Sequence, residues 1–288
     1  NNPMSAVCSL ICNHGAQCEG HCVRGIKGES VSIGKLERYV ADRNRADGYV
    51  PLKAENITTG TGMLMNVSLE LHKGEILGIG GLSHCGMHEL GRALFGEEKL
   101  LEGRVTDMAT GDAITSPLVA KQHGYGYVSK DRDKEALVLI ESIKDNIMAA
   151  GYDKVQNGPF LSPKASKTYV NKQKDDLSIK CASIVQDVQY LSGGNKQKVV
   201  FGKWVGRDCD ILILDCPTRG VDIGVKAAMY HLIGQMKKAG KSIVMISEEL
   251  PELIGMSDRL LILKDGQQTG EYHRSPELNA NMLVDAMI

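Results

Sequence analysis

The chain has 288 residues, of which 42% are hydrophobic and 24% charged, and its formal net charge is −1. This is the composition of a soluble globular protein long enough for one large or two modest domains. A charge so close to zero creates no field that attracts nucleic acid. No apolar run approaches the ~20 residues that span a bilayer. The N-terminus shows no secretory signal, and because the chain starts at Asn1 we expect a processed or excised polypeptide.

Four of the eight cysteines lie within the first 22 residues, at Cys8, Cys12, Cys18 and Cys22. Such tight clustering favours metal binding in a reducing cytoplasm over a disulfide framework, which would spread its bridges through a small domain. Closely spaced thiolates can converge on one iron–sulfur cluster. Four thiolates also satisfy a structural zinc site, and a segment that binds no metal is the third alternative.

The residues around these cysteines resemble a known iron–sulfur domain. Residues 17–25 (QCEGHCVRG) and 33–38 (IGKLER) resemble the iron–sulfur N-terminal domain of glutamate synthase small subunits and dihydropyrimidine dehydrogenases. The resemblance implies that residues 1–45 form a Cys-rich iron–sulfur-like segment. That domain normally draws further cysteines from upstream, so here it implies at most one [4Fe-4S] cluster, held by the four cysteines.

Residues 50–288 alternate between short β-branched runs and amphipathic stretches. This alternation predicts an α/β fold with parallel strands. The polar, Lys-rich stretch from Lys154 to Lys180 indicates an inserted helical subdomain. The predicted elements include strands at Glu75–Ile79, Ile211–Asp215 and Ser242–Ser247 and helices at His88–Leu94 and Lys226–Lys238.

Residues 81–88 (GLSHCGMH) follow a predicted strand and open a predicted helix. Gly81 and Gly86 have the separation of the two glycines in a P-loop. Met87 stands at the P-loop lysine and His88 at the Mg²⁺-binding hydroxyl, so one strong charge-assisted phosphate contact is missing. The alternative is a Gly-rich strand–helix turn that binds nothing.

A second Gly-rich turn and a second strand follow later in the chain. Residues 191–198 (LSGGNKQK) present backbone N–H groups to an anion at a basic helix start, unless Ser192 merely caps a helix. Asp215 ends a buried apolar strand, where a nucleotide's Mg²⁺ would be held. Cys216 comes next, and a thiol of pKa ~8.5 in an apolar strand stays neutral and is a poor base.

The order and spacing of these two motifs resemble the signature motif and Walker B strand of an ATP-binding cassette. Residues 50–288 are similar to the second cassette of bacterial ribose, galactose and xylose importers. They share its sequence motifs at 73–78 (KGEILG), 217–222 (PTRGVD) and 250–252 (LPE). The resemblance implies a P-loop NTPase-type ABC nucleotide-binding domain with a helical subdomain. A degenerate P-loop is already typical of these second cassettes.

The resemblance also implies roles for individual residues. Ser192, Gly193 and Gly194 would close over ATP held by a partner cassette, whereas Gly81, Gly86 and Asp215 would frame the chain's own phosphate site. Asp222 lies in the D-loop that couples the two sites. Three positions depart from the family pattern, with Cys216 replacing the catalytic glutamate, Lys130 the Q-loop glutamine and Glu248 the switch histidine.

The implied function is that of an ATP-binding subunit, or half-subunit, of an ABC sugar importer, cytoplasmic and peripheral on the inner face of the membrane. Its partners would be another cassette, the permease subunits and, indirectly, a periplasmic or extracellular sugar-binding protein. ATP and Mg²⁺ would bind weakly or at a shared site, and the isolated chain would hydrolyse little ATP. The alternatives are a catalytically inactive pseudo-ATPase and an iron–sulfur electron-transfer protein on a cassette scaffold.

Overall fold

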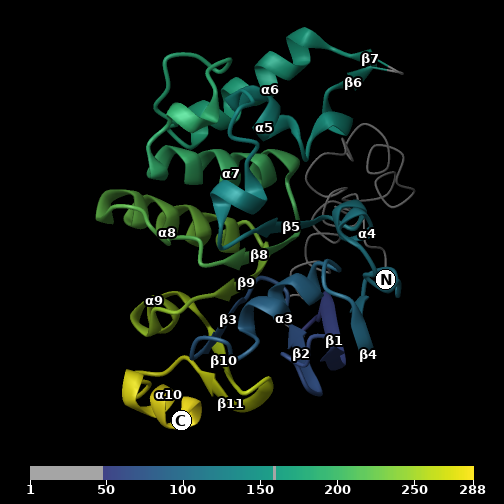
Figure 1. Cartoon of the computed structure of the whole chain (residues 1–288), viewed down its shortest axis with the longest axis vertical. Helices are drawn as coiled ribbons and strands as arrows, with labels where there is room; N and C mark the ends of the chain where they lie inside the picture. Colours follow the sequence, from purple (N-terminus) through teal and green to yellow (C-terminus); the bar gives the residue numbers. More distant parts are fainter. Residues whose placement is uncertain (1–47, 158–159) are drawn as a thin grey trace, which may run out of the picture. The chain divides into compact units, whose positions relative to one another are not determined.

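The computed structural model describes residues 48–157 and 160–288 (Figure 1). The chain divides into two units between Pro51 and Leu52, and the helices and strands below belong to the second unit. The segment predicted for residues 1–45, with its four cysteines, lies outside the described residues. No helix in the described ranges is long and apolar enough to cross a membrane.

The central sheet has six strands in the order β11-β10-β3-β9-β8-β5. Every neighbouring pair is parallel except β10 and β11. The residues of β8 and β9 are all buried, as expected for parallel strands covered on both faces. Because parallel strands end at the same edge of a sheet, the loops after β3, β5, β8 and β9 meet there. The strands are β3 (Ile76–Gly81), β5 (Tyr125–Val128), β8 (Ile211–Asp215), β9 (Ser242–Ile246), β10 (Arg259–Lys264) and β11 (Gln267–His273).

A smaller antiparallel sheet has the order β2-β1-β4. Its strands are β1 (Leu52–Thr59), β2 (Val67–Leu71) and β4 (Leu100–Asp107). Buried side chains of this sheet, of the central sheet and of helix α3 (Met87–Leu94) form one hydrophobic cluster, which includes Leu52, Leu90 and Ile213. The first helix after β3 is therefore fixed by packing between two sheets.

A helical subdomain is built from α5 (Ile143–Met148), α6 (Pro163–Asp176) and α7 (Gly193–Arg207), which pack on one another (Figure 1). Each of these helices starts at a serine whose hydroxyl accepts a hydrogen bond from a backbone N–H in the first turn, the preferred N-cap arrangement. The stretch predicted for this subdomain, 154–180, contains α6 together with the short strands β6 (Gln156–Asn157) and β7 (Phe160–Leu161).

The remaining helices connect and close the central sheet. They are α4 (Pro117–Gln122), the π-helical turn η2 (Arg132–Ala136), the 3₁₀ turns η3 (Tyr152–Lys154) and η4 (Val188–Tyr190), α8 (Ile223–Lys238), α9 (Leu250–Met256) and α10 (Ala280–Met287). The α/β fold is confirmed, with small shifts at element ends. Helix α8 begins before the predicted Lys226 because the Asp222 carboxylate accepts a hydrogen bond from the Val225 N–H and caps it. Strand β3 runs to Gly81 because it pairs with Leu263 of β10.

Candidate functional site

The loop from β3 to α3 has the tight backbone path that its two glycines predict. Gly86 adopts φ 94°, in the left-handed region, and is the N-cap of α3 without a side-chain cap. A Cβ at Gly86 would lie 2.2 Å from the Met63 carbonyl oxygen, and one at Gly81 would lie 2.5 Å from the Leu263 carbonyl oxygen. Both positions therefore require glycine, whatever the loop binds.

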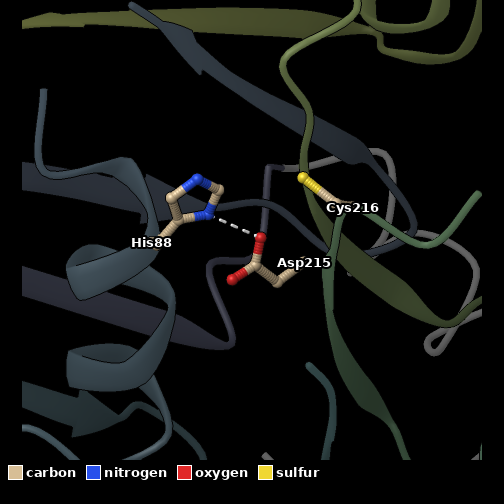
Figure 2. Close-up of side chains that lie close together, drawn as sticks. All are labelled: His88, Asp215 and Cys216. Atoms are coloured by element: carbon tan, nitrogen blue, oxygen red, sulfur yellow. Dashed lines mark hydrogen bonds and ion pairs between the residues drawn. The ribbon is translucent and has the colours of Figure 1, made fainter. Parts of the chain in front are cut away.

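The first two residues of α3 point in different directions. Met87 is 1% exposed and belongs to the hydrophobic core between the sheets, so its side chain brings no polar group to the loop. His88 turns toward the end of β8, where its Nδ1 lies 2.7 Å from Oδ1 of Asp215 (Figure 2). The other oxygen of Asp215, Oδ2, accepts a hydrogen bond of 3.3 Å from the Tyr127 hydroxyl. Both oxygens of this buried carboxylate thus have protein donors.

Lys130 and Glu248 extend this arrangement on the other side of the imidazole ring. The Lys130 Nζ lies 2.9 Å from His88 Nε2 and 2.7 Å from Glu248 Oε1. Because the ammonium can only donate, His88 Nε2 accepts, and Nδ1 carries the proton that it donates to Asp215. A continuous hydrogen-bonded chain therefore runs from Glu248 through Lys130 and His88 to Asp215.

The charges of this chain set the ionisation of its members. The hydrogen bond from Lys130, supported by its charge, lowers the pKa of Glu248. Burial, together with the nearby Asp215 carboxylate, raises the pKa of Tyr127 far above its ordinary value, so its hydroxyl stays protonated and acts as a donor. The network thus pairs Lys130 with Glu248 as an ion pair, while the Asp215 carboxylate is held by the neutral donors His88 and Tyr127.

The side chains present do not fit an Mg²⁺–ATP complex in this arrangement. Magnesium prefers octahedral oxygen ligands and retained waters. Here an imidazole occupies the position of the hydroxyl ligand, and it holds one oxygen of Asp215. No ammonium stands at Met87, and the one at Lys130 is paired with Glu248. The groups that would face phosphate and magnesium satisfy each other instead.

Cys216 follows Asp215 directly, with φ 48°, and its side chain is buried. Its Sγ, a nitrogen of His88 and a carboxylate oxygen of Asp215 all lie within 4.8 Å of one another (Figure 2). Burial, followed by the charges of Asp215 and Glu248, raises the pKa of the thiol to about 12. A neutral thiol cannot take a proton from water, so Cys216 does not replace a catalytic glutamate as a base.

The signature turn begins α7 and is exposed at Ser192. The Ser192 Oγ accepts hydrogen bonds from the backbone N–H and the side-chain amide of Asn195, at 3.4 and 3.0 Å. Gly193 lies against Arg132, because a Cβ there would be 3.0 Å from Nη2 of that residue. Gly194 is buried, and a Cβ added there would lie 2.7 Å from the Val225 side chain. The two glycines therefore let the turn pack closely on its neighbours.

Two side chains bond to the backbone of residues 217–220, next to and within the segment 219–222 that stands at the position of the D-loop. Arg132 donates from Nη1 to the Arg219 carbonyl oxygen at 2.7 Å and from Nη2 to that of Gly220 at 3.4 Å. Gln197 of α7 donates to the Pro217 carbonyl oxygen at 2.7 Å. Residues 217–220 are thus bonded to both α7, through Pro217, and the turn that follows Lys130, through Arg219 and Gly220.

The predicted site residues fall into two groups. His88, Lys130, Asp215, Cys216 and Glu248 come together at the edge of the central sheet, beside the glycine loop. Ser192, Gly193, Gly194 and Asp222 lie at the starts of α7 and α8. Sequence reasoning missed the roles of Tyr127 and Arg132. A tyrosine in an apolar strand has no distinguishing pattern, and the pair Asp131-Arg132, although shared with the second cassettes, does not reveal the backbone groups that Arg132 bonds.

Comparison with known proteins places the chain in a family. The family model for the ABC transporter matches residues 64–219, more than half of the chain. The chain belongs to the ABC transporter family. A second family model, dihydropyrimidine dehydrogenase domain II with a 4Fe-4S cluster, matches residues 1–49. The predicted resemblances are therefore confirmed at the level of family.

Relatives of this ABC protein include sugar-import components. It is 38% identical to the galactose/methyl galactoside import ATP-binding protein MglA of Clostridium tetani, over 79% of this chain and 46% of the relative. It is 36% identical to the ribose import ATP-binding protein RbsA of Lactococcus lactis, over 89% of this chain and 54% of the relative. The chain thus spans about half the length of the curated relatives it matches.

Solved structures support the cassette fold. A nucleotide-free ATP-binding cassette from an ABC transporter superposes with a TM-score of 0.67 at 21% identity, over 83% of this chain and 99% of the other. The dimeric bacterial ABC transporter cassette MJ0796 gives a TM-score of 0.68 at 19% identity, over 78% of this chain and 99% of the other. At this identity the likeness concerns the fold alone.

Proposed function

We propose that this chain is the assisting cassette of an ABC sugar importer, whose signature turn completes an ATP site on a partner cassette. The single observation that carries the proposal is the contrast between the two groups of site residues. Ser192 is exposed at the start of α7, and Arg132 holds the adjacent D-loop, whereas the chain's own His88, Lys130 and Asp215 are bonded to one another.

The chain's own phosphate loop contributes little to hydrolysis in this proposal. Hydrolysis needs a base or water-positioning group beside the γ-phosphate and cationic groups around it. Cys216 is a neutral thiol, and Lys130 is committed to His88 and Glu248. The work of the chain is then to place its signature turn against the partner's nucleotide.

The cellular setting follows from the relatives, which are named as galactose, ribose and xylose import ATP-binding proteins. The proposed partners are a cassette with an intact P-loop and membrane permease subunits, with a sugar-binding protein acting through the permease. The cassette would occupy residues 50–288 and lie in the cytoplasm against the inner face of the membrane, and residues 1–45 would form a separate Cys-rich segment.

The test is to combine the chain with a first cassette from a sugar-import relative and to compare ATP turnover of the mixture with that of each part. We expect turnover to rise on mixing and to fall about tenfold or more with Ser192→Asp, because like charges placed together cost several kcal/mol. Aspartate caps helices as well as serine does, so the variant should fold.

The matched control is Ser162→Asp, which changes the corresponding N-cap of α6. It should leave the turnover of the mixture unchanged. The proposal fails if Ser192→Asp has no more effect than Ser162→Asp, or if mixing never raises turnover above the sum of the parts.

A second candidate function concerns residues 1–45 and is favoured by the match to a 4Fe-4S family model over residues 1–49. In this proposal Cys8, Cys12, Cys18 and Cys22 hold one [4Fe-4S] cluster. Anaerobic purification followed by iron and sulfide analysis should give about four of each per chain, with visible thiolate-to-iron absorbance. Zinc without iron would instead establish a structural zinc site, and a metal-free protein would establish a segment that binds no metal.

A further inference from the structure

Three side chains at the end of β8 and the start of α3 offer three different ligand atoms. His88 contributes an imidazole nitrogen, Asp215 a carboxylate oxygen and Cys216 a sulfur, and these atoms lie within 4.8 Å of one another (Figure 2). Asp215 and Cys216 are buried, at 1% and 7% exposed, and His88 is half-buried. We propose that His88, Asp215 and Cys216 bind one transition-metal ion of borderline softness, of which Zn²⁺ is the type.

The donor set decides the class of ion. Imidazole and thiolate suit zinc and its neighbours, whereas magnesium and calcium prefer oxygen ligands. Zinc bonds of about 2.0–2.3 Å to nitrogen, oxygen and sulfur place tetrahedral ligand atoms less than about 4 Å apart. The three atoms therefore need only a small closing movement, and a fourth position stays open for water.

Glu248 completes the surroundings of the imidazole. A metal-bound histidine usually donates its other ring N–H to a carboxylate, which fixes the ring and its tautomer. When Nδ1 of His88 binds the ion, its proton moves to Nε2, so the Lys130 ammonium, 2.9 Å from that atom, gives up its hydrogen bond there and moves away. Nε2 then donates to Glu248 Oε1, which lies 3.5 Å from it. Lys130 keeps its ion pair with Glu248 at 2.7 Å.

The charges and protons of the bound state balance. The Cys216 thiol loses its proton to solvent, and the two positive charges of the ion meet one thiolate and the Asp215 carboxylate. Lys130 and Glu248 continue to neutralise each other. Binding thus replaces the His88–Asp215 hydrogen bond with metal bonds, exchanges the Lys130–His88 hydrogen bond for one from His88 to Glu248, and leaves no uncompensated charge at the site. This inference concerns the chain's own loop and does not depend on the signature turn.

Cys209 provides a matched control near the other end of the same strand. It is also buried, and burial raises the pKa of its thiol to about 12, as for Cys216. Within residues 48–157 and 160–288, no histidine–carboxylate group that could hold an ion includes Cys209. A difference between the two cysteines therefore reports the ligand set rather than burial.

The test titrates Co²⁺, a spectroscopic substitute for Zn²⁺, into the full-length chain carrying Ser at Cys8, Cys12, Cys18 and Cys22. We expect one ion per chain by equilibrium dialysis, a thiolate-to-cobalt charge-transfer band, and loss of that band when Zn²⁺ but not excess Mg²⁺ is added. Cys216→Ser should abolish the band and Cys209→Ser should leave it. Glu248→Gln should weaken binding by about 10- to 100-fold, as for partners of metal-bound histidines.

Two outcomes overturn the proposal. One is a folded parent chain that binds no Co²⁺ or Zn²⁺ at the stoichiometry of one. The other is a band that survives Cys216→Ser or disappears with Cys209→Ser. If replacing the four N-terminal cysteines prevents folding, the unmodified chain and the chain with Cys216→Ser are compared in parallel equilibrium dialyses. The proposal then requires the unmodified chain to bind one ion more than the variant.

Discussion

At the scale of single residues, the buried Asp215 carboxylate depends on its two donors. Removing a carboxylate from water costs free energy unless hydrogen bonds replace its hydration. His88 supplies one of these bonds from α3, and Tyr127 supplies the other from β5. Each donor comes from a different element, so the carboxylate also links the helix to two strands of the central sheet.

The first prediction concerns the hydroxyl of Tyr127. Tyr127→Phe should lower the free energy of unfolding by about 1–3 kcal/mol, because Oδ2 of Asp215 is left without that donor in a buried position. Urea denaturation measures the change. Tyr169→Phe is the control, because the Tyr169 hydroxyl has no hydrogen-bond partner among the described residues. Equal effects of the two substitutions would contradict the proposed role of the Tyr127 hydroxyl.

The second prediction concerns Lys130 and pH. The Lys130 hydrogen bond lowers the pKa of Glu248, so this pairing stabilises the fold above the unfolded glutamate pKa and is lost as pH falls through the lowered value. Lys130→Met should raise the pKa of Glu248, as followed by NMR. Its destabilising effect from the lost pairing should be full at neutral pH and fade in acid.

The control for this prediction is Lys172→Met. Lys172 pairs with Asp176 at 2.6 Å on the exposed face of α6, and it makes no bond with Glu248. Its removal should leave the titration of Glu248 unchanged. If Glu248 titrates identically in Lys130→Met and in the unmodified chain, the network from Glu248 to Asp215 is not formed in solution.

At the scale of elements, the loop between β3 and α3 contains Gly86, which has a left-handed φ and leaves no room for a side chain. Gly86→Ala should destabilise the fold by more than Gly111→Ala, although both glycines have positive φ, 94° and 82°. At Gly111 a Cβ meets nothing within 4 Å, so only the left-handed cost of about 1–2 kcal/mol applies. At Gly86 the Met63 carbonyl oxygen must also move.

Urea denaturation of these two variants separates the steric cost from the conformational cost. The difference between them is the free energy of displacing the Met63 carbonyl group and the Leu64 side chain, which lie 2.2 and 2.8 Å from the added Cβ. Similar stabilities would show that the loop relaxes around an added methyl group, and that its glycines are kept for conformation alone.

The elements that the sequence predicts well are those whose signals are local. Strand Ile211–Asp215 is predicted with its observed bounds. Its four apolar residues followed by an aspartate form a run of strand length, as expected for a strand that is buried on both faces. The helical subdomain is predicted too short, as 154–180. Its α5 and α7 join α6 through contacts between residues far apart in the chain, which no local pattern contains.

The candidate site divides in the same way. Departures at His88, Lys130 and Glu248 can be identified one by one from motif positions. That Lys130 bonds both of the others cannot be predicted, because it depends on the loops after three separate elements reaching one edge of the sheet. The hydrogen bonds that join these three side chains are a property of the fold and not of any single motif.

At the scale of the whole molecule, the fourth prediction is that a carboxylate introduced at Cys216 will not by itself enable the isolated chain to hydrolyse ATP. The isolated chain with Cys216→Glu should show negligible phosphate release, because the introduced carboxyl lies beside Asp215 and because Lys130 and His88 remain paired. An intact cassette from a relative, assayed in parallel, is the control. Turnover near the ~10 s⁻¹ typical of enzymes would contradict this.

The hydrogen-bonded chain from Glu248 to Asp215 also constrains which replacements the fold tolerates at this loop. Exchanging Lys130 for a neutral residue leaves Glu248 without its counter-ion, and exchanging His88 takes one of two donors from the buried Asp215 carboxylate. Leaving the buried carboxylate short of a donor is costly, whereas the Glu248 side chain is 40% exposed and can turn to water. For the assisting cassette proposed above, single replacements toward the family residues at this loop therefore give less stable variants, and only coordinated replacements avoid that cost.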